Sequence, residues 1–187
     1  ILHRPDEKYT CQIGDGRALA RLTGIDVIGD FRSADMQAGG QGAPLTPLYH
    51  KALSTKLLGK ENIAILNLGG VGNVTFINAK GILAFDTGPG NALLDDWMMT
   101  NTGRPLDAQG ETARTGVVDD ELLTVWMSHP YFDKGAPKSL DRQGFATLGL
   151  ENLSLEDGAA TLTAFTVNSI LKAEGLLETT PTTWIIC

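Results

Sequence analysis

The stretch IAILNLGGVGNVTFINAKGILAF, residues 63–85, decides the fold class of this chain. It contains three short runs of apolar and β-branched side chains, at residues 63–68, 73–78 and 82–85. The turns GGVG and AKG separate these runs, and strand–turn–strand–turn–strand at this spacing predicts an antiparallel meander. Because the runs are almost continuously apolar, we expect both faces of the sheet to be covered.

A helix is predicted directly after the meander, with Asn91 as its N-cap. Its apolar face would be made by four side chains: Leu93, Leu94, Trp97 and Met98. A shorter helix is expected near residues 119–127, and residues 129–145 are rich in loop-forming residues. These signals place an irregular insertion in the middle of the chain.

A long helix is predicted from Ser154, which forms a capping-box pattern with Asp157, to about Gly175. The face expected to be buried contains Ala160, Ala164, Val167 and Leu171. An apolar strand, TTWIIC at 182–187, follows. The order of three antiparallel strands, helix, insertion, long helix and strand predicts an α/β fold with a mixed sheet.

The first 60 residues give weaker structural signals. GIDVIGDF, residues 24–31, predicts a short buried strand over 26–29, and AGGQGAP at 38–44 predicts a glycine-rich loop. Residues 45–58 suit a helix that breaks near Pro47.

Composition excludes several classes of protein. A net charge of −7 over 187 residues argues against a surface for nucleic acid or anionic membrane. Cys11 and Cys187 lack metal-ligand spacing and favour a reduced, cytosolic protein. No apolar run reaches the roughly 20 residues that span a bilayer, and the N-terminus does not resemble a signal peptide. A first residue other than Met and an unfinished last strand indicate part of a longer chain.

Two glycine-rich segments contain candidate binding or catalytic residues. GGVG at 69–72 leaves backbone N–H groups accessible to a phosphate, or is a plain hairpin turn. Asp86 ends a predicted strand and precedes TGPG and a helix N-terminus, whose dipole would favour the ionised carboxylate. Such a carboxylate is suited to act as a general base, and the alternative is that it caps the helix or orders the turn.

The other candidates have equally plain structural alternatives. Arg32 could hold a carboxylate or phosphate and Gln41 a sugar hydroxyl, or they could form a surface ion pair and a flexible loop. The basic residues of PKSLDR, 137–142, could contact substrate but are more simply read as solvated. The three histidines are scattered without ligand spacing, so no metal held by the protein itself is predicted.

Seven segments occur in a distinctive order and spacing: QIGDG (12–16), GDFR (29–32), AGGQGAPL (38–45), NLGGVGNVT (67–75), FDTGPGNALLD (85–95), PYF (130–132) and APKS (136–139). Together they resemble the anhydro-N-acetylmuramic acid kinase family over nearly the whole chain. The resemblance implies part of an actin-like ATPase or sugar-kinase (ribonuclease H-like) fold. Residues 1–60 would then end the N-terminal kinase lobe, and 61–187 would begin the C-terminal lobe.

The resemblance also implies a function in cell-wall (peptidoglycan) recycling. Members of this family are cytoplasmic, ATP- and Mg²⁺-dependent kinases that convert 1,6-anhydro-N-acetylmuramic acid and water to N-acetylmuramic acid 6-phosphate. The implied catalytic base is Asp86. The implied nucleotide and phosphate contacts are Gly69, Gly70, Asn73, Gly88 and Gly90. The sugar contacts expected from motif position and side-chain chemistry are Asp30, Arg32, Gln41 and Asn91.

The implied partners are therefore an amino sugar and ATP, and a homodimer is compatible with the resemblance. The family's N-terminal GxMSGTSxDG phosphate loop and its triple-glycine adenosine turn do not occur in these 187 residues, so the piece alone is expected to be inactive. LDRQ at 140–143 also departs from the TGRE expected in many relatives. The alternatives are another sugar or acetate-type kinase of the same fold, or a non-catalytic actin-like ATPase module.

Overall fold

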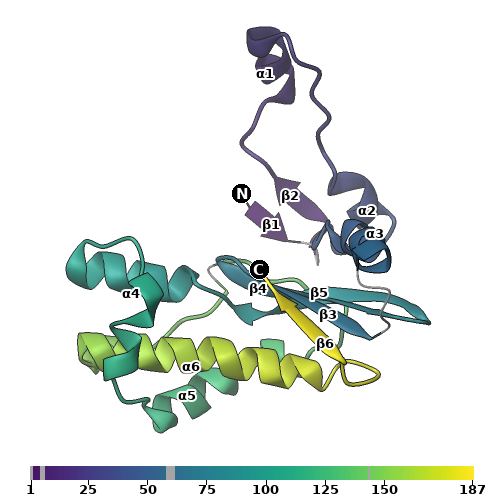
Figure 1. Cartoon of the computed structure of the whole chain (residues 1–187). Helices are drawn as coiled ribbons and strands as arrows, with labels where there is room; N and C mark the ends of the chain where they lie inside the picture. The colour runs from purple at the N-terminus through teal and green to yellow at the C-terminus, as the bar shows by residue number, and fades with distance from the viewer. Residues whose placement is uncertain (1, 5–6, 58–61, 143) are drawn as a thin grey trace.

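The computed structural model describes residues 2–4, 7–57, 62–142 and 144–187 (Figure 1). Its body is a four-stranded sheet with helices on both faces. The strands are β3 (Ile63–Leu68), β4 (Val71–Asn78), β5 (Gly81–Pro89) and β6 (Thr183–Ile186). The helices around the sheet are α3 (Pro47–Leu57), α4 (Ala92–Thr102), α5 (Asp120–Met127) and α6 (Leu155–Glu174). Short 3₁₀ turns lie between them: η2 (Ala108–Gly110), η3 (Ala113–Thr115), η4 (Pro130–Asp133) and η5 (Leu150–Asn152).

The sheet has the strand order β5-β4-β3-β6. Strands β3, β4 and β5 form the predicted antiparallel meander, and β6 returns parallel to β3, pairing Thr183 with Ile63. The predicted α/β class and mixed sheet are therefore confirmed.

A β-bulge interrupts the pairing of β4 with β5. Gly72 pairs with Gly88 and Asn73 pairs with Asp86, so Thr87 is the extra residue. A bulge locally changes the direction of side chains, and this one sets Asp86 opposite Asn73. The strand also continues through the TGP segment to Pro89, whereas the sequence predicted that it ended at Asp86.

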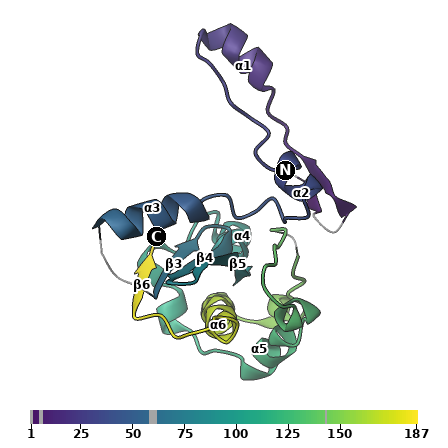
Figure 2. The same cartoon turned by 90° about the vertical axis from the view of Figure 1, so that its right-hand side faces the viewer.

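Helices α3 and α6 lie on opposite faces of the sheet, as Figure 2 shows. Helices α4 and α5 pack against α6. The largest buried apolar cluster joins α5, α6 and the loops between them: Trp126, Tyr131, Phe132, Phe145, Leu150, Leu162 and Phe165. None of the helices in the described part of the chain is both long and apolar enough to span a bilayer.

The long helix occurs where it was predicted, but its buried face was predicted only in part: Ala160 is buried as expected. Val167 and Leu171 are 48% and 60% exposed. The side chains that face the core are larger or more tightly packed ones, among them Leu162, Phe165, Ser169 and Ala173. The apolar pattern misled because Phe165, which dominates burial, lies on a neighbouring stripe of the helix. Ser154 accepts a hydrogen bond from Asp157 N, but the Asp157 carboxylate binds Val117 N, so the capping box is only half formed.

The N-terminal part contains a small hairpin, β1 (Leu2–Arg4) and β2 (Tyr9–Cys11), followed by α1 (Gly16–Thr23) and α2 (Ser33–Gln37). Helix α1 projects away from the body in both views (Figures 1 and 2). The buried strand predicted over residues 26–29 is wrong: these residues form no strand and are exposed. Pro47 begins α3 and does not break it, because its fixed φ and missing N–H are tolerated in a first helical turn. Residue 58, the predicted end of that helix, lies outside the described residues.

Candidate active site

Asp86 lies at the wall of a cavity of about 780 Å³. The cavity lies between the N-terminal part, the sheet and the loop that follows η4. Its lining residues include His3, Arg32, Thr46, His50, Asn67, Asn73, Asp86, Leu140, Asp141, Arg142 and Cys187. Asn67 pairs with Asn73, and Asn73 with Asp86, so three polar side chains cross neighbouring strands in one row.

The η4 turn and the loop after it hold Asp86 through both its backbone and its side chain. Asp86 N donates to Lys138 O at 2.9 Å, and Tyr131 Oη donates to Asp86 O at 2.5 Å. Leu140 N donates to Asp86 Oδ2 at 2.7 Å. The capping alternative for Asp86 is therefore wrong, because its carboxylate accepts from Leu140 and not from the start of α4.

Asp86 is only 7% exposed, and this burial shifts the pKa of its carboxyl in the direction opposite to the one expected from the helix dipole. Burial raises its pKa to about 6, while the Leu140 N–H and the Arg32 guanidinium act in the opposite direction. The helix dipole predicted to favour the ionised form is not the dominant influence. An acid with a pKa near 6 is still mostly ionised at neutral pH and is basic enough to take a proton.

The GGVG hairpin is joined to the start of α4. Gly69 O accepts from Asn91 N at 2.8 Å, and Gly70 O accepts from Gly90 N at 3.1 Å. Gly69 and Gly70 are exposed at the hairpin. Their contact with phosphate stays a prediction, and Asn73 is the member of the predicted phosphate set that lines the cavity.

Gly88 and Gly90 are buried and permit close packing. A Cβ on Gly90 would lie 2.2 Å from Gly69 O, and one on Gly88 would lie 2.6 Å from Ser169 Cβ. Neither lines the cavity, and their contact with phosphate stays a prediction. Thr87, the extra residue of the β-bulge, has a buried hydroxyl oxygen with no hydrogen-bond partner among the described residues.

The four predicted sugar contacts are separated by the structure. Arg32 lines the cavity and donates from Nη1 to Gly42 O at 2.8 Å. Gln41 lies in a smaller pocket next to the main cavity, where its Oε1 accepts from Ser139 Oγ at 3.2 Å. Asp30 is exposed, and its Oδ1 accepts from Ser33 N.

Asn91 is also placed outside the main cavity. It is the N-cap residue of α4, as predicted, but its side chain makes no capping bond and donates instead from Nδ2 to Leu68 O at 2.6 Å. The amide was available for this contact because the α4 N–H groups of residues 91 and 92 are already bonded to hairpin carbonyls.

Several cavity residues were missed by sequence reasoning. The sequence predicts no role for His3 or His50, because the histidines are scattered along it. Both nevertheless line the cavity, and His50 Nδ1 is hydrogen-bonded to Thr75 Oγ1 at 2.8 Å. Asn67 could have been found, since it is a polar residue inside an apolar strand. Asp141 and Arg142 lie in the loop predicted to be solvated, for whose basic residues substrate contact is the alternative; both are exposed at the cavity rim, and Arg142 pairs with Asp96 at 2.7 Å.

Comparison with known proteins agrees with these motifs. The family model described as anhydro-N-acetylmuramic acid kinase matches residues 1–187. Proteins of that name from Methylobacterium nodulans and Rhodopseudomonas palustris are each 52% identical over the whole chain, which covers 50% and 51% of their lengths. One from Rhodospirillum rubrum is 50% identical over the whole chain. The chain spans about half the length of these relatives, and it belongs to the anhydro-N-acetylmuramic acid kinase family.

Proposed function

We propose that the whole protein is an ATP-dependent kinase that converts 1,6-anhydro-N-acetylmuramic acid and water to N-acetylmuramic acid 6-phosphate. The observation that carries the proposal is Asp86: a buried carboxylate, fixed through one oxygen by Leu140 N–H, at the wall of a polar cavity. The names of the related proteins support the same substrate.

Asp86 would act as the general base of this reaction. Among the described residues, Leu140 N–H is the donor to its carboxylate, and it binds Oδ2. Oδ1 is then available to take a proton from the water that attacks the anomeric carbon. The bond between that carbon and O6 breaks, and O6 forms a bond to the γ-phosphorus of ATP as ADP leaves. Positioned base catalysis contributes about 10²–10⁴-fold.

Polar side chains around Asp86 would bind the sugar. Arg32 presents a guanidinium suited to a substrate carboxylate, and Asn67 and Asn73 present amides suited to hydroxyl groups. Gln41 would support this wall through Ser139 and not by direct contact. Asp30 and Asn91 are no longer proposed as contacts, because neither lines the cavity.

The exposed Gly69 and Gly70 hairpin next to Asn73 would approach the phosphates of ATP. The described residues form no group of three or more His, Cys, Asp or Glu able to hold a metal ion, and the cavity wall offers one carboxylate besides the proposed base, that of Asp141. This donor set fits Mg²⁺ carried by the nucleotide, since Mg²⁺ is usually held by one or two carboxylates and substrate phosphates. When bound, the ion neutralises phosphate charge.

The fold and the cellular location of the proposed enzyme follow the same family. The sheet and its two helical layers suit one part of an actin-like, ribonuclease H-like kinase fold, with residues 1–60 in one lobe and 61–187 in the other. We propose a cytoplasmic enzyme, compatible with a homodimer, whose partners are an amino sugar and ATP. Nucleic acid and membrane are not proposed as partners, in line with the net charge of −7.

A product assay tests the proposal. The whole protein is incubated with ATP and either 1,6-anhydro-N-acetylmuramic acid or a plain hexose, and phosphorylated sugar is measured by mass spectrometry. We expect a phosphorylated, ring-opened product from the anhydro-sugar, with one water-derived oxygen when the reaction is run in ¹⁸O-water. Phosphorylation of the hexose alone would instead indicate an ordinary sugar kinase.

A further inference from the structure

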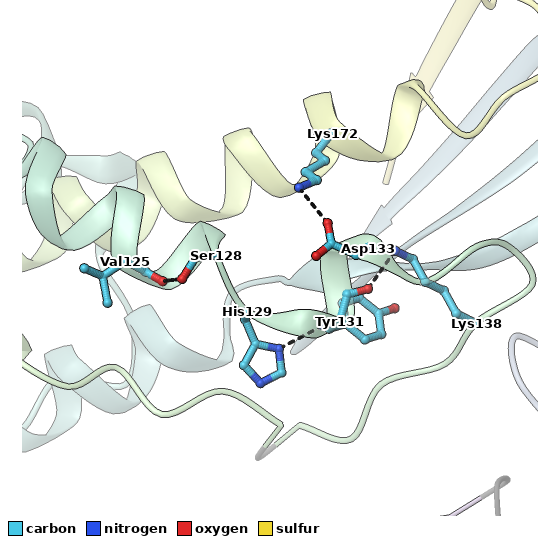
Figure 3. A network of polar contacts seen from close by, with 7 residues as sticks. All are labelled: Val125, Ser128, His129, Tyr131, Asp133, Lys138 and Lys172. Carbon is cyan, nitrogen blue, oxygen red and sulfur yellow. Dashed lines mark hydrogen bonds and ion pairs between the residues drawn. The ribbon is translucent and has the colours of Figure 1, made fainter.

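Lys138 is a buried cation that the proposed reaction does not use. It was predicted to be solvated, but it is only 5% exposed. Its Nζ donates to Tyr131 O at 3.1 Å and lies 4.5 Å from the centre of the Tyr131 ring (Figure 3). Burial lowers the pKa of Lys138, so its charged form is disfavoured there unless these contacts stabilise it.

Tyr131 connects this lysine to the proposed base. Its ring packs edge-on against Phe132 and Phe145, with centroids 5.8 Å and 5.9 Å away. Its hydroxyl donates to the backbone carbonyl of Asp86. Burial raises the pKa of Tyr131 above its usual value, so the hydroxyl remains a donor at neutral pH.

The turn that contains Tyr131 is anchored on each side. His129 Nδ1 accepts from Tyr131 N at 3.2 Å, and Asp133 pairs with Lys172 of α6 at 3.4 Å. Figure 3 shows these contacts together with the Lys138 bond to Tyr131. Tyr131 is therefore held by its N–H, its carbonyl, its ring and its hydroxyl.

From these contacts we propose that Tyr131 and Lys138 are positioning residues for Asp86. They hold the loop of residues 131–140 against β5 so that Leu140 N–H fixes Oδ2 and Oδ1 remains directed to the cavity. The inference rests on the proposed role of Asp86 as base. A loop with a packing role alone would not need to bind Asp86 at its N–H, its carbonyl and its carboxylate.

Loosening this loop has two physical consequences. A displaced carboxylate reacts more slowly, since a shift of about 1 Å in a catalytic group can cost about 10²-fold in rate. A weaker Leu140 N–H bond also stabilises the carboxylate less, which raises the pKa of Asp86 further. The second effect distinguishes positioning from a loss of folding stability alone.

The test uses Tyr131→Phe, which removes only the hydroxyl, and Lys138→Met, which removes the ammonium group and keeps an unbranched side chain. Each is expected to lower kcat of the whole protein about 10-fold to 100-fold with little change in KM, and to move the acidic limb of the pH–rate profile to higher pH. Tyr9→Phe and Lys80→Met, at exposed sites, are the controls and should behave as wild type.

The double variant Tyr131→Phe with Lys138→Met should lose little more than the worse single variant, because both changes act through the same turn. The Asp86 carboxyl is also titrated directly by ¹³C NMR, with Asp86→Asn identifying the signal. A higher midpoint in both single variants supports positioning even if Asp86 proves not to be the base. Wild-type turnover and an unchanged midpoint in Tyr131→Phe would overturn the inference.

Discussion

In the role proposed for Asp86, two opposing requirements meet at a single residue. A general base must be ionised, whereas burial at the sheet edge favours the neutral acid and raises the pKa to about 6. The Leu140 N–H and the Arg32 charge limit that rise. The resulting value lies near neutral pH, where a carboxylate is both largely ionised and able to accept a proton.

Replacing this carboxylate should separate binding from turnover. In the whole protein, Asp86→Asn is expected to lower kcat by about 10²–10⁴-fold while ATP still binds, because the amide has the same shape but cannot take the proton. Steady-state kinetics and a nucleotide-binding titration measure the two effects. Asp120→Asn, exposed on α5, is the control with normal turnover. Near-normal turnover of Asp86→Asn would remove Asp86 from the role of base.

The same substitution should increase stability at neutral pH. The Asp86 pKa is about 6 in the folded state and 3.8 as an ordinary carboxyl, so the folded state binds the proton more tightly. This tighter proton binding stabilises the folded state fully below the unfolded-state pKa, and the stabilisation is lost as pH rises through the folded-state pKa. Asn does not titrate, so Asp86→Asn should gain up to about 3 kcal/mol over wild type at pH 7.

Urea unfolding of both proteins at several pH values measures this difference. The advantage of Asp86→Asn should be near zero at about pH 4 and grow through about pH 6, where the folded carboxyl ionises. An advantage that does not change with pH would mean that the substitution acts through packing and not through the charge.

At the scale of elements, the hairpin and α4 behave as one unit. Hairpin carbonyls at Gly69 and Gly70 accept the first N–H groups of the helix, so these donors are satisfied within the protein. Gly90 permits this contact, because its backbone lies against the hairpin backbone. The sequence motif that resembles a phosphate loop is thus also a packing motif.

Gly90→Ala should break this unit. The new Cβ would lie 2.2 Å from Gly69 O and 3.0 Å from Gly72 N, both backbone atoms that cannot move independently. We expect a loss of about 1–3 kcal/mol in the free energy of unfolding, measured by urea denaturation. At exposed Gly14 an added Cβ meets nothing within 4 Å, so Gly14→Ala should be close to neutral. Equal stability of the two variants would contradict the packing role of Gly90.

Helix α6 offers a second matched pair. Phe165 is fully buried and contacts Phe132, Phe145 and Trp126, whereas Val167 is 48% exposed. Phe165→Ala should cost about 3–5 kcal/mol, and Val167→Ala should stay within about 0.5 kcal/mol. Urea denaturation of both variants checks the assignment. A larger loss for Val167→Ala would restore the face predicted from the sequence.

At the scale of the whole molecule, the candidate site depends on distant parts of the chain. Arg32 comes from the N-terminal part, Asn73 and Asp86 from the sheet, and Leu140 from the loop after η4. The chain spans about half the length of its relatives. Under the proposed function, we expect further contacts with substrate and nucleotide to come from the rest of the protein.

A protein of residues 1–187 alone should not turn over substrate. We expect no phosphorylated sugar above background in the product assay described above, while the whole protein under the same conditions is active. Circular dichroism of the shorter protein serves as the control for folding. Measurable turnover by residues 1–187 would show that these residues contain a complete site.

Local sequence patterns were sufficient to predict the framework of this protein. Alternating apolar runs and glycine turns predicted the meander, and the motif at 85–95 predicted the helix that follows Asp86. They failed over residues 26–29, where an apolar run is exposed because no neighbouring element covers it. They also failed for Lys138, because its burial depends on Tyr131 and the sheet edge and not on its own neighbours in sequence.

The sequence alone determined which elements form and which family the motifs resemble. The elements follow from the short-range periodicity of apolar residues, and the resemblance follows from the order of the motifs. Only the tertiary structure decided which polar groups meet. Asp86 is bound by Leu140, 54 residues later in the chain, and its raised pKa comes from burial that no local pattern records. Charge and desolvation act through space, so the state of this carboxylate is a property of the folded molecule.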